Sequence, residues 1–469
     1  MTLLGCLLVP LGLLVALASE EWAFRLFVIS APFSDSVIAN VGSGDNASGI
    51  QIWMFFGLLW LLRKCLSMVW NLRFDANRGI LSSARGLGIF ALICCLSLVM
   101  PLYINGSLAL MAPLLLDDTT TPLYLTSQNF TALLYILFGS SLALLIAHKC
   151  LEVNGIRRIS KLYLGTGVFV ALWGIYQLAS NVLNLPYPTA LFNNNLSASV
   201  SGPDTTLDSI NLHRVSSVAV EPSILVQVLL SILPLTLPAI MNIGCVFSRS
   251  KDRMMASILL LALILTFSPV APLGIVICAV LGWQVMTKAS VVHRRKTTAY
   301  IVVWITGLGM ATGVLYLISG AFRGLLTTML LSKAASYSGL ERLKTITYAA
   351  NYFSDYPILG VGWGSVTSHD LVFKLLANVG ILGTLAFIYF VGVMMKRGYH
   401  YVKLRADPML NKGMWVVSFI VMMVANALTG FGYVFGHFWL VTGVAIACTV
   451  YVRQEDIRRQ KTISREAAI

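Results

Sequence analysis

Residues 128–148 read QNFTALLYILFGSSLALLIAH, a run without an acidic or basic side chain before its final histidine. A helix of about 20 apolar residues can cross the roughly 30 Å hydrocarbon core of a bilayer. A helix also satisfies its own backbone hydrogen bonds, which lipid cannot do. Similar apolar runs recur from one end of the chain to the other. The stretch therefore predicts a polytopic α-helical membrane protein.

The composition agrees with this class, because 57% of the 469 residues are hydrophobic, 11% are charged and the mean hydropathy is +0.81. We expect one all-α membrane domain over residues 1–469 with about 12 transmembrane helices. The expected spans are 2–19, 50–70, 84–103, 128–148, 161–183, 219–245, 254–268, 270–287, 298–319, 371–395, 413–432 and 434–452. Residues 20–40 could form a further short span or an interfacial helix.

The amino-terminal stretch MTLLGCLLVPLGLLVALA has no basic residue before its apolar core, which favours a first span over a cleavable signal. The eight cysteines show neither metal-ligand spacing nor a disulfide pattern, so we interpret them as packing residues.

The distribution of basic residues predicts the orientation. Of the 33 lysines and arginines, 26 fall in alternate connections between the expected spans. Basic residues accumulate in cytoplasmic loops, so this side and both termini are expected in the cytoplasm. The net charge of +14 is thereby explained by topology rather than by nucleic-acid binding.

The remaining seven basic residues are expected on the outer face, where the two long loops 184–217 and 320–370 also lie. These residues are Arg25, Arg214, Arg323, Lys333, Arg342, Lys344 and Lys374. Loop 320–370 begins with apolar residues near helical spacing and cations between them, which predicts amphipathic helices on the membrane surface.

The stretch NLHRVSSVAVEPS at 211–223 places an arginine and a glutamate beside an expected span. Pro222 is tolerated in the first turn of a helix, so Glu221 should lie at a helix start, where the helix dipole favours a carboxylate. Glu221 could simply cap the helix and Arg214 could be a surface residue. If 214–221 were helical, the two side chains would share one face.

A second interpretation joins Arg214, Arg342 and His369, which come from separate loops on the same side. Paired guanidinium N–H donors match phosphate oxygens, and arginine stays charged at neutral pH. The histidine or Glu221 could exchange a proton with a sugar hydroxyl. We find no carboxylate cluster for a metal, no P-loop, and few ionisable residues in mid-span of the kind that ion-coupled pumps keep.

Three stretches resemble the superfamily of bacterial O-antigen polymerases and O-antigen ligases. HRVSSVAVEPSILVQ (213–227) is similar to its arginine followed by Glu-Pro at a helix start. SGLERLKTITYAANYFSDYPILGVGWG (338–364) is similar to its loop arginine followed by a PxxGxGxG turn. SHDLVFKLLANVGILGTLAF (368–387) is similar to its histidine followed by a helix with a G-x-x-G step.

The resemblance implies a GT-C-like glycosyltransferase of the bacterial inner membrane, acting on its periplasmic face without metal or other cofactor. It implies a donor glycan linked through diphosphate to undecaprenol, in contact with membrane lipids and with a chain-length regulator protein as a further partner. Arg214 and Arg342 would bind the diphosphate, and Glu221 or His369 would be the base. Arg323, Lys344 and Trp363 are further candidates for phosphate or sugar contact, although Trp363 could instead anchor the chain at the interface.

Several residues depart from the family pattern. Asp370 stands where the family often has Asn, and Asn378 stands where an acidic residue often precedes the glycine step. Pro269 replaces an arginine common in ligase-like members. These differences favour a polymerase over a ligase, and a flippase for the same lipid-linked sugars is the third alternative.

Overall fold

The computed structural model describes residues 1–42, 48–71, 77–111, 119–196, 206–207, 212–289, 310, 317, 320, 324, 337–403 and 410–466. Most of these residues form α-helices, so the expected all-α class is confirmed for the described part of the chain. Three small antiparallel sheets of two strands each lie beside the helices. Outside the described residues lie Arg323, Lys333, parts of both long loops and the expected span 298–319 apart from residues 310 and 317.

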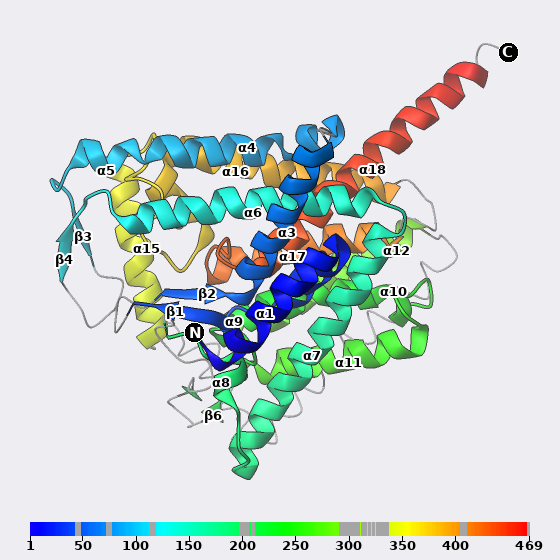
Figure 1. The fold of residues 1–469 in the computed structure, drawn as a ribbon, viewed down its shortest axis with the longest axis horizontal. Helices are drawn as coiled ribbons and strands as arrows, with labels where there is room; N and C mark the ends of the chain where they lie inside the picture. The colour runs from blue at the N-terminus through cyan, green and yellow to red at the C-terminus, as the bar shows by residue number, and fades with distance from the viewer. Residues whose placement is uncertain are drawn as a thin grey trace.

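The longer helices run along a common bundle (Figure 1). They are α1 (Leu3–Ala18), α3 (Ile52–Asn71), α4 (Arg78–Ser97), α6 (Ser127–Leu151), α7 (Gly155–Leu183), α9 (Pro222–Ile232), α11 (Arg249–Leu265), α12 (Val270–Ala289), α16 (Leu371–Lys403), α17 (Leu410–Thr429) and α18 (Gly436–Glu466). The other helices are α2 (Glu20–Ser30), α5 (Val99–Ile104), α8 (Thr189–Phe192), the 3-10 helix η3 (Leu233–Thr236), α10 (Leu237–Ile240) and α15 (Tyr337–Asp355). The paired strands are β1 (Val37–Val41) with β2 (Ser48–Gln51), β3 (Ala109–Met111) with β4 (Thr120–Pro122), and β5 (Thr206–Leu207) with β6 (Leu212–His213).

Seven helical segments among the described residues are long and apolar enough to cross a membrane. They are α3, α4 with α5, α6, α7, α9 with η3 and α10, α16, and α17. Three shorter apolar helices join them, in α1, α12 and the first half of α18. The chain is therefore a multi-pass membrane protein, and its described residues contain fewer clear spans than the 12 predicted for the whole chain. One expected span, α11, begins with Arg249, Lys251, Asp252 and Arg253, which shortens its apolar part.

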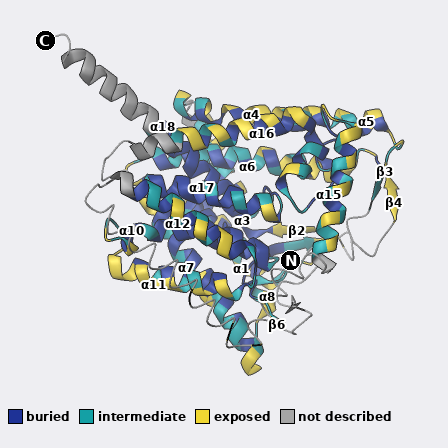
Figure 2. Cartoon of the chain, turned by 180° about the vertical axis from the view of Figure 1, so that it is seen from behind, coloured by how far each residue is buried: buried dark blue, intermediate teal, exposed yellow. Residues whose placement is uncertain are grey.

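The centre of the bundle consists of helices that are apolar on every side. All residues of α9 are buried, and α17 and the first half of α18 are mostly buried beside it (Figure 2). A helix that is hydrophobic all round belongs inside a protein or a membrane. By contrast, α1 exposes leucines on its outer side, including Leu7 and Leu14, as expected of a helix that faces lipid.

The two ends of the bundle differ in what they carry. We call the end with β1–β4 and α15 the ribbon end, and the opposite end, with Lys64, Lys149 and Arg158, the basic end (Figure 1). The α4, α6 and α16 helices run from one end to the other.

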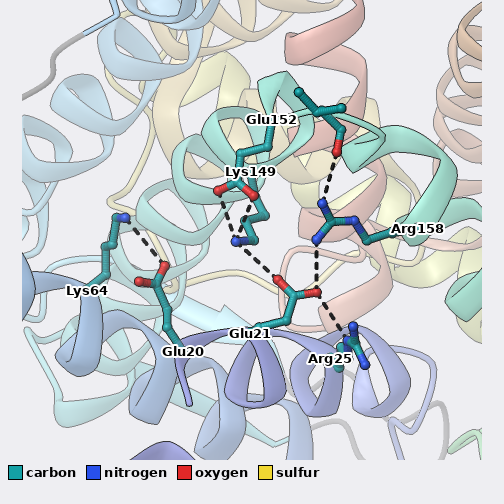
Figure 3. A network of polar contacts seen from close by, with 8 residues as sticks. Glu20, Glu21, Arg25, Lys64, Lys149, Glu152 and Arg158 are labelled. Atoms are coloured by element: carbon teal, nitrogen blue, oxygen red, sulfur yellow. Dashed lines mark hydrogen bonds and ion pairs between the residues drawn. The ribbon is translucent and has the colours of Figure 1, made fainter.

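A network of ion pairs joins α2, α3, α6 and α7 at the basic end (Figure 3). Glu21 pairs with Arg25 at 3.1 Å, with Lys149 at 3.2 Å and with Arg158 at 3.3 Å. The neighbouring Glu20 pairs with Lys64 alone among the described ion pairs, at 3.4 Å. The network therefore fixes the turn between α1 and α2 at the basic end.

The prediction that both termini lie on one side is wrong. The Thr2 hydroxyl donates to the carbonyl of Val37 at 2.7 Å, so α1 begins at the ribbon end. The Tyr451 hydroxyl in α18 donates to the carbonyl of Cys150, so the carboxyl-terminal helix leaves at the basic end. The difference arises because α2 brings the chain back to the ribbon end, where the Asp35 N–H donates to the Val218 carbonyl. Residues 20–40 thus add a return passage, and Arg25 lies at the basic end.

Candidate functional site

The segment before α9 is held rigidly at the ribbon end by the side chain of Gln177 in α7. Its Oε1 accepts hydrogen bonds from the N–H groups of Ser216 and Ser217, at 3.0 and 2.7 Å. The Ser217 hydroxyl donates to the Val170 carbonyl, and its φ of 56° lies in the left-handed region. A non-glycine residue adopts this conformation only where the surroundings hold it. The segment therefore positions the residues on either side of it.

Arg214 and Glu221 lie at the two ends of this segment, and both side chains are half-buried. The Arg214 Nε donates to the carbonyl of Thr266 at 3.3 Å, at the end of α11. Glu221 is the N-cap residue of α9 and Pro222 follows it in the first turn, as the sequence predicts. Residues 214–221 are not helical, so the two side chains do not share a helix face.

The Glu221 side chain does not cap its own helix. Its Oε2 accepts a hydrogen bond from the Ser223 hydroxyl at 2.9 Å, and its side chain makes no hydrogen bond to the first backbone N–H groups of α9. The interpretation of Glu221 as a capping residue therefore does not describe this structure. The carboxylate keeps acceptor capacity for another group.

Arg342 comes from α15, which lies at the ribbon end (Figure 1). Its Nη1 donates to the carbonyl of Leu428 at 3.0 Å, near the end of α17. Helix carbonyls at a carboxyl terminus have no partner within the helix, so a cation is favoured there. The contact anchors one guanidinium nitrogen to the bundle and directs α15 across it.

The turn predicted from Pro357 and the following glycines fits into a break in α16. At Gly380 the backbone leaves helical geometry, with φ 60° and ψ −163°. There the N–H of Ile381 donates to the Pro357 carbonyl at 2.8 Å, and the N–H of Val361 donates to the Ala377 carbonyl at 2.7 Å. The break in α16 thus supplies partners for a turn that would otherwise bury unpaired backbone groups.

Asn378 joins the same turn to the segment that precedes His369. Its Oδ1 accepts from the Val366 N–H at 3.0 Å, and its Nδ2 donates to the Val366 carbonyl at 2.9 Å. A carboxylate could not make the second bond, because it has no hydrogen to donate. The departure from the acidic family pattern therefore has a structural role here.

His369 and Asp370 lie at the start of α16, beside the loop after α17. The backbone of His369 approaches Gly430, where a Cβ would lie 3.7 Å from the His369 carbonyl oxygen. Asp370 caps α16, because its Oδ1 accepts from the Phe373 N–H at 2.7 Å and its Oδ2 accepts from the Ser368 hydroxyl. The cap fixes where α16 begins and hence where His369 stands.

The charges of Arg342 and Glu221 act on both Arg214 and His369. Burial lowers the pKa of Arg214, the Glu221 carboxylate raises it and the Arg342 charge lowers it again. Burial likewise lowers the pKa of His369, and the charge of Arg342 lowers it further, while Glu221 opposes this shift. These groups therefore lie within one another's electric field. His369 is favoured in its neutral form, which can accept a proton.

The further candidates are placed differently. The Trp363 side chain is 1% exposed and packs against Phe90, Phe431 and Tyr433, so its ring is a core residue in this structure rather than a surface for sugar. Lys344 is half-buried in α15, two residues from Arg342. Within the described residues, no group of three or more His, Cys, Asp or Glu side chains could hold a metal ion.

Sequence reasoning missed two residues beside the site. Lys374 was counted among the outward cations but not included in the site, and its charge lowers the pKa of His369. Gln227 in α9 is fully buried and donates to the carbonyl of Gly430 at 3.4 Å. The count of outer cations could have identified Lys374, whereas Gln227 resembles any polar residue in a span.

Comparison with protein-family models finds no match for the chain, and no curated protein is significantly similar to it.

Proposed function

We propose that the protein is an O-antigen polymerase, which joins undecaprenyl-diphosphate-linked oligosaccharide units by metal-independent glycosyl transfer. The observation that supports this most is the convergence of Arg214, Arg342, Glu221 and His369 at the ribbon end of a membrane bundle. Two arginines whose charges repel each other raise the free energy of the site unless an anion binds between them. A lipid diphosphate at headgroup depth is such an anion.

In this mechanism the acceptor hydroxyl attacks the anomeric carbon of the donor sugar. A new glycosidic C–O bond forms, the bond between the sugar and the diphosphate breaks, and undecaprenyl diphosphate leaves. Arg214 and Arg342 stabilise the negative charge that grows on the leaving group, which is most effective where water is excluded. The hydroxyl proton passes to Glu221 or to the neutral His369, and both remain candidates for the base.

The orientation follows from the charges. The described basic residues Lys64, Lys149 and Arg158 lie at the basic end, which is proposed to face the cytoplasm. The ribbon end then faces the periplasm of a bacterial inner membrane, where flipped lipid-linked glycans are presented. A chain-length regulator protein would bind at the same face.

The test is the surface glycan of a deletion strain that carries each variant. Arg342→Ala or Arg214→Ala should abolish chain extension, whereas membrane insertion should be unchanged. Arg253→Ala is the matched control, because its Nε also donates to a backbone carbonyl, that of Ala239 at 3.0 Å, but near the start of α11. Normal polymer from both site variants would refute the diphosphate-binding role of Arg214 and Arg342.

The banding pattern of the deletion strain separates the alternatives. A single repeat unit on lipid core indicates a lost polymerase. Bare core with accumulating lipid-linked polymer indicates a lost O-antigen ligase, which would transfer glycan to lipid A–core. Lipid-linked single repeats that stay on the cytoplasmic leaflet indicate a lost flippase.

A further inference from the structure

Lys374 is a cation inside a candidate membrane span without a carboxylate partner in the described structure. It lies in the first turn of the span Leu371–Arg397 and is half-buried. Its Nζ stands 5.2 Å from the ring centroid of Tyr433, and no ion pair among the described residues includes it. The nearest acid along the helix, Asp370, acts on Lys374 through its charge but forms no ion pair with it, and its two oxygens accept from the Ser368 hydroxyl and the Phe373 N–H.

A buried lysine within a membrane span costs free energy unless its charge has a partner. Charged side chains within membrane spans are rare, and most pair with an opposite charge or line a substrate path. An aromatic face compensates only part of the cost of removing an ammonium group from water. The Tyr433 ring therefore does not account for Lys374 by itself.

The neighbouring loop carries further polar groups without partners. Gln227 is fully buried, and its Oε1 has no hydrogen-bond partner in the described structure. This oxygen lies beside Gly432, because a Cβ on that glycine would stand 3.0 Å from it. The Nε1 of Trp363 is also buried without a partner, and its ring lies 5.0 Å from that of Tyr433. Both groups lie against the loop that presents Tyr433 to Lys374. Unpaired buried polar groups call for an explanation, and an absent polar ligand is one.

Lys374 lies within the candidate span Leu371–Arg397, whereas Arg214, Glu221, Arg342 and His369 lie outside the candidate spans of the described residues. It is the fourth residue of α16, so the helical rise of about 1.5 Å per residue places it roughly 4.5 Å beyond the start of the helix. In a lipid diphosphate, the phosphate that bears the prenyl chain lies deeper than the phosphate that bears the sugar. The order of the cations along the membrane normal thus matches the order of the two phosphates.

We infer that Lys374 binds the prenyl-bearing phosphate of the lipid diphosphate, while Arg214 and Arg342 bind the sugar-bearing phosphate. The inference rests on the proposed function. The ammonium group would gain the anionic partner that the described chain does not provide. The Tyr433 ring would hold it in place when the site is empty.

The experiment compares the binding of two prenyl lipids to the purified full-length chain in detergent. Geranylgeranyl diphosphate carries both phosphates, and geranylgeranyl monophosphate carries only the one that bears the prenyl chain. The apparent Kd is obtained from the dependence of the unfolding temperature on lipid concentration. Variants are Lys374→Met, Lys374→Gln and Lys374→Arg, together with Arg342→Ala.

Lys161→Met is the matched control. This lysine is also half-buried, in α7, and its Nζ stands 5.8 Å from the ring centroid of Phe247, but it lies six residues from the start of its helix at the basic end. The Lys161→Met variant should bind both lipids with the same apparent Kd as the wild type. Its unfolding temperature without lipid also shows what the loss of a lysine over an aromatic ring costs in stability.

Lys374→Met should weaken the binding of both lipids by the same factor, at least tenfold, and Lys374→Arg should restore most of it. Arg342→Ala should weaken only the diphosphate. If Lys374→Met loses too much stability to purify, Lys374→Gln serves as the neutral variant. Unchanged binding in the neutral variant, or a loss confined to the diphosphate, would overturn the assignment of Lys374 while leaving the arginine site intact. A wild type that binds neither lipid would remove the proposed function and this inference together.

Discussion

Gly380 allows the sharpest test of how the site is built, because its replacement by alanine should separate α16 from the turn that begins at Pro357. A Cβ at Gly380 would lie 2.2 Å from the Ile358 carbonyl oxygen and 2.6 Å from the Leu359 nitrogen. Both atoms belong to backbone, so neither can move aside as a flexible side chain would. The φ of 60° with ψ −163° is in addition a conformation that only glycine adopts readily.

The expected loss of folding free energy in Gly380→Ala has two causes, the strained backbone conformation and the steric overlap of the new methyl group. The backbone strain contributes about 1 to 3 kcal/mol. Forcing a methyl group into a closed space adds about 1 to 3 kcal/mol more. Together Gly380→Ala should lower the free energy of unfolding by roughly 2 to 6 kcal/mol. Because the segment with His369 is joined to the same turn through Asn378, the proposed glycan polymerisation should fall as well.

Gly392→Ala in the same helix is the matched control. This glycine is exposed, and a Cβ there would meet nothing within 4 Å. In a helix interior alanine is favoured over glycine by about 1 kcal/mol, so this variant should be as stable as the wild type or slightly more so. The assay is the apparent unfolding temperature in detergent at one heating rate, followed by tryptophan fluorescence, together with the banding of surface glycan. Equal behaviour of the two variants would refute the role of the break.

Three further variants test other parts of the structure. Burial raises the pKa of the Asp35 carboxyl to about 7, and its hydrogen bond from Asn193 opposes the shift. The stability that the protonated carboxyl contributes is complete below pH ~4 and is lost as the pH rises through about 7. The unfolding temperature of the wild type should therefore fall across this pH range relative to that of Asp35→Asn. The carboxylate of Glu341 raises the pKa of His369, so Glu341→Gln should lower this pKa and shift the acid limb of the activity profile to lower pH. Glu21→Gln removes three ion pairs and should lower the free energy of unfolding by roughly 1 kcal/mol. This loss should exceed the loss caused by Glu20→Gln. The difference between the two variants should shrink at high salt.

For each of these three variants, one measured outcome would contradict the expectation. A parallel pH dependence of the wild type and the Asp35 variant would show that the carboxyl does not titrate in this range. An acid limb that stays in place or moves to higher pH would remove His369 as the group that reports it. Equal stabilities of the two glutamate variants at low salt would contradict the ion network of Figure 3.

From the sequence we predicted that Arg214, Glu221, Arg342 and His369 share one site, and this stays a prediction. It depends on the few cations that remain outside the basic loops, and on the thin layer that residues on one side of a membrane must share. Pro222 also marks the start of α9 by local chemistry alone. These signals depend on short stretches and on counting, both of which a single sequence provides.

Other features depend on contacts between distant segments, and the sequence does not reveal them. The break at Gly380 exists because a turn some twenty residues earlier fits into it. Trp363 was expected to contact sugar or the membrane interface, but the approach of Phe90 from α4 and of Tyr433 from the loop after α17 buries it. The return passage of α2 was ambiguous because its 11 residues are too short for an ordinary span.

The ion network at the basic end has a consequence for synthesis of the chain. Glu21 and Arg158 are separated by 137 residues. At about 5 to 20 residues per second, the ribosome needs roughly 7 to 27 seconds to make the intervening polypeptide. During that interval Glu21 can pair with Arg25 and then with Lys149, but not with Arg158. A chain that ends before α7 would therefore lack the ion pair that joins α2 to α7.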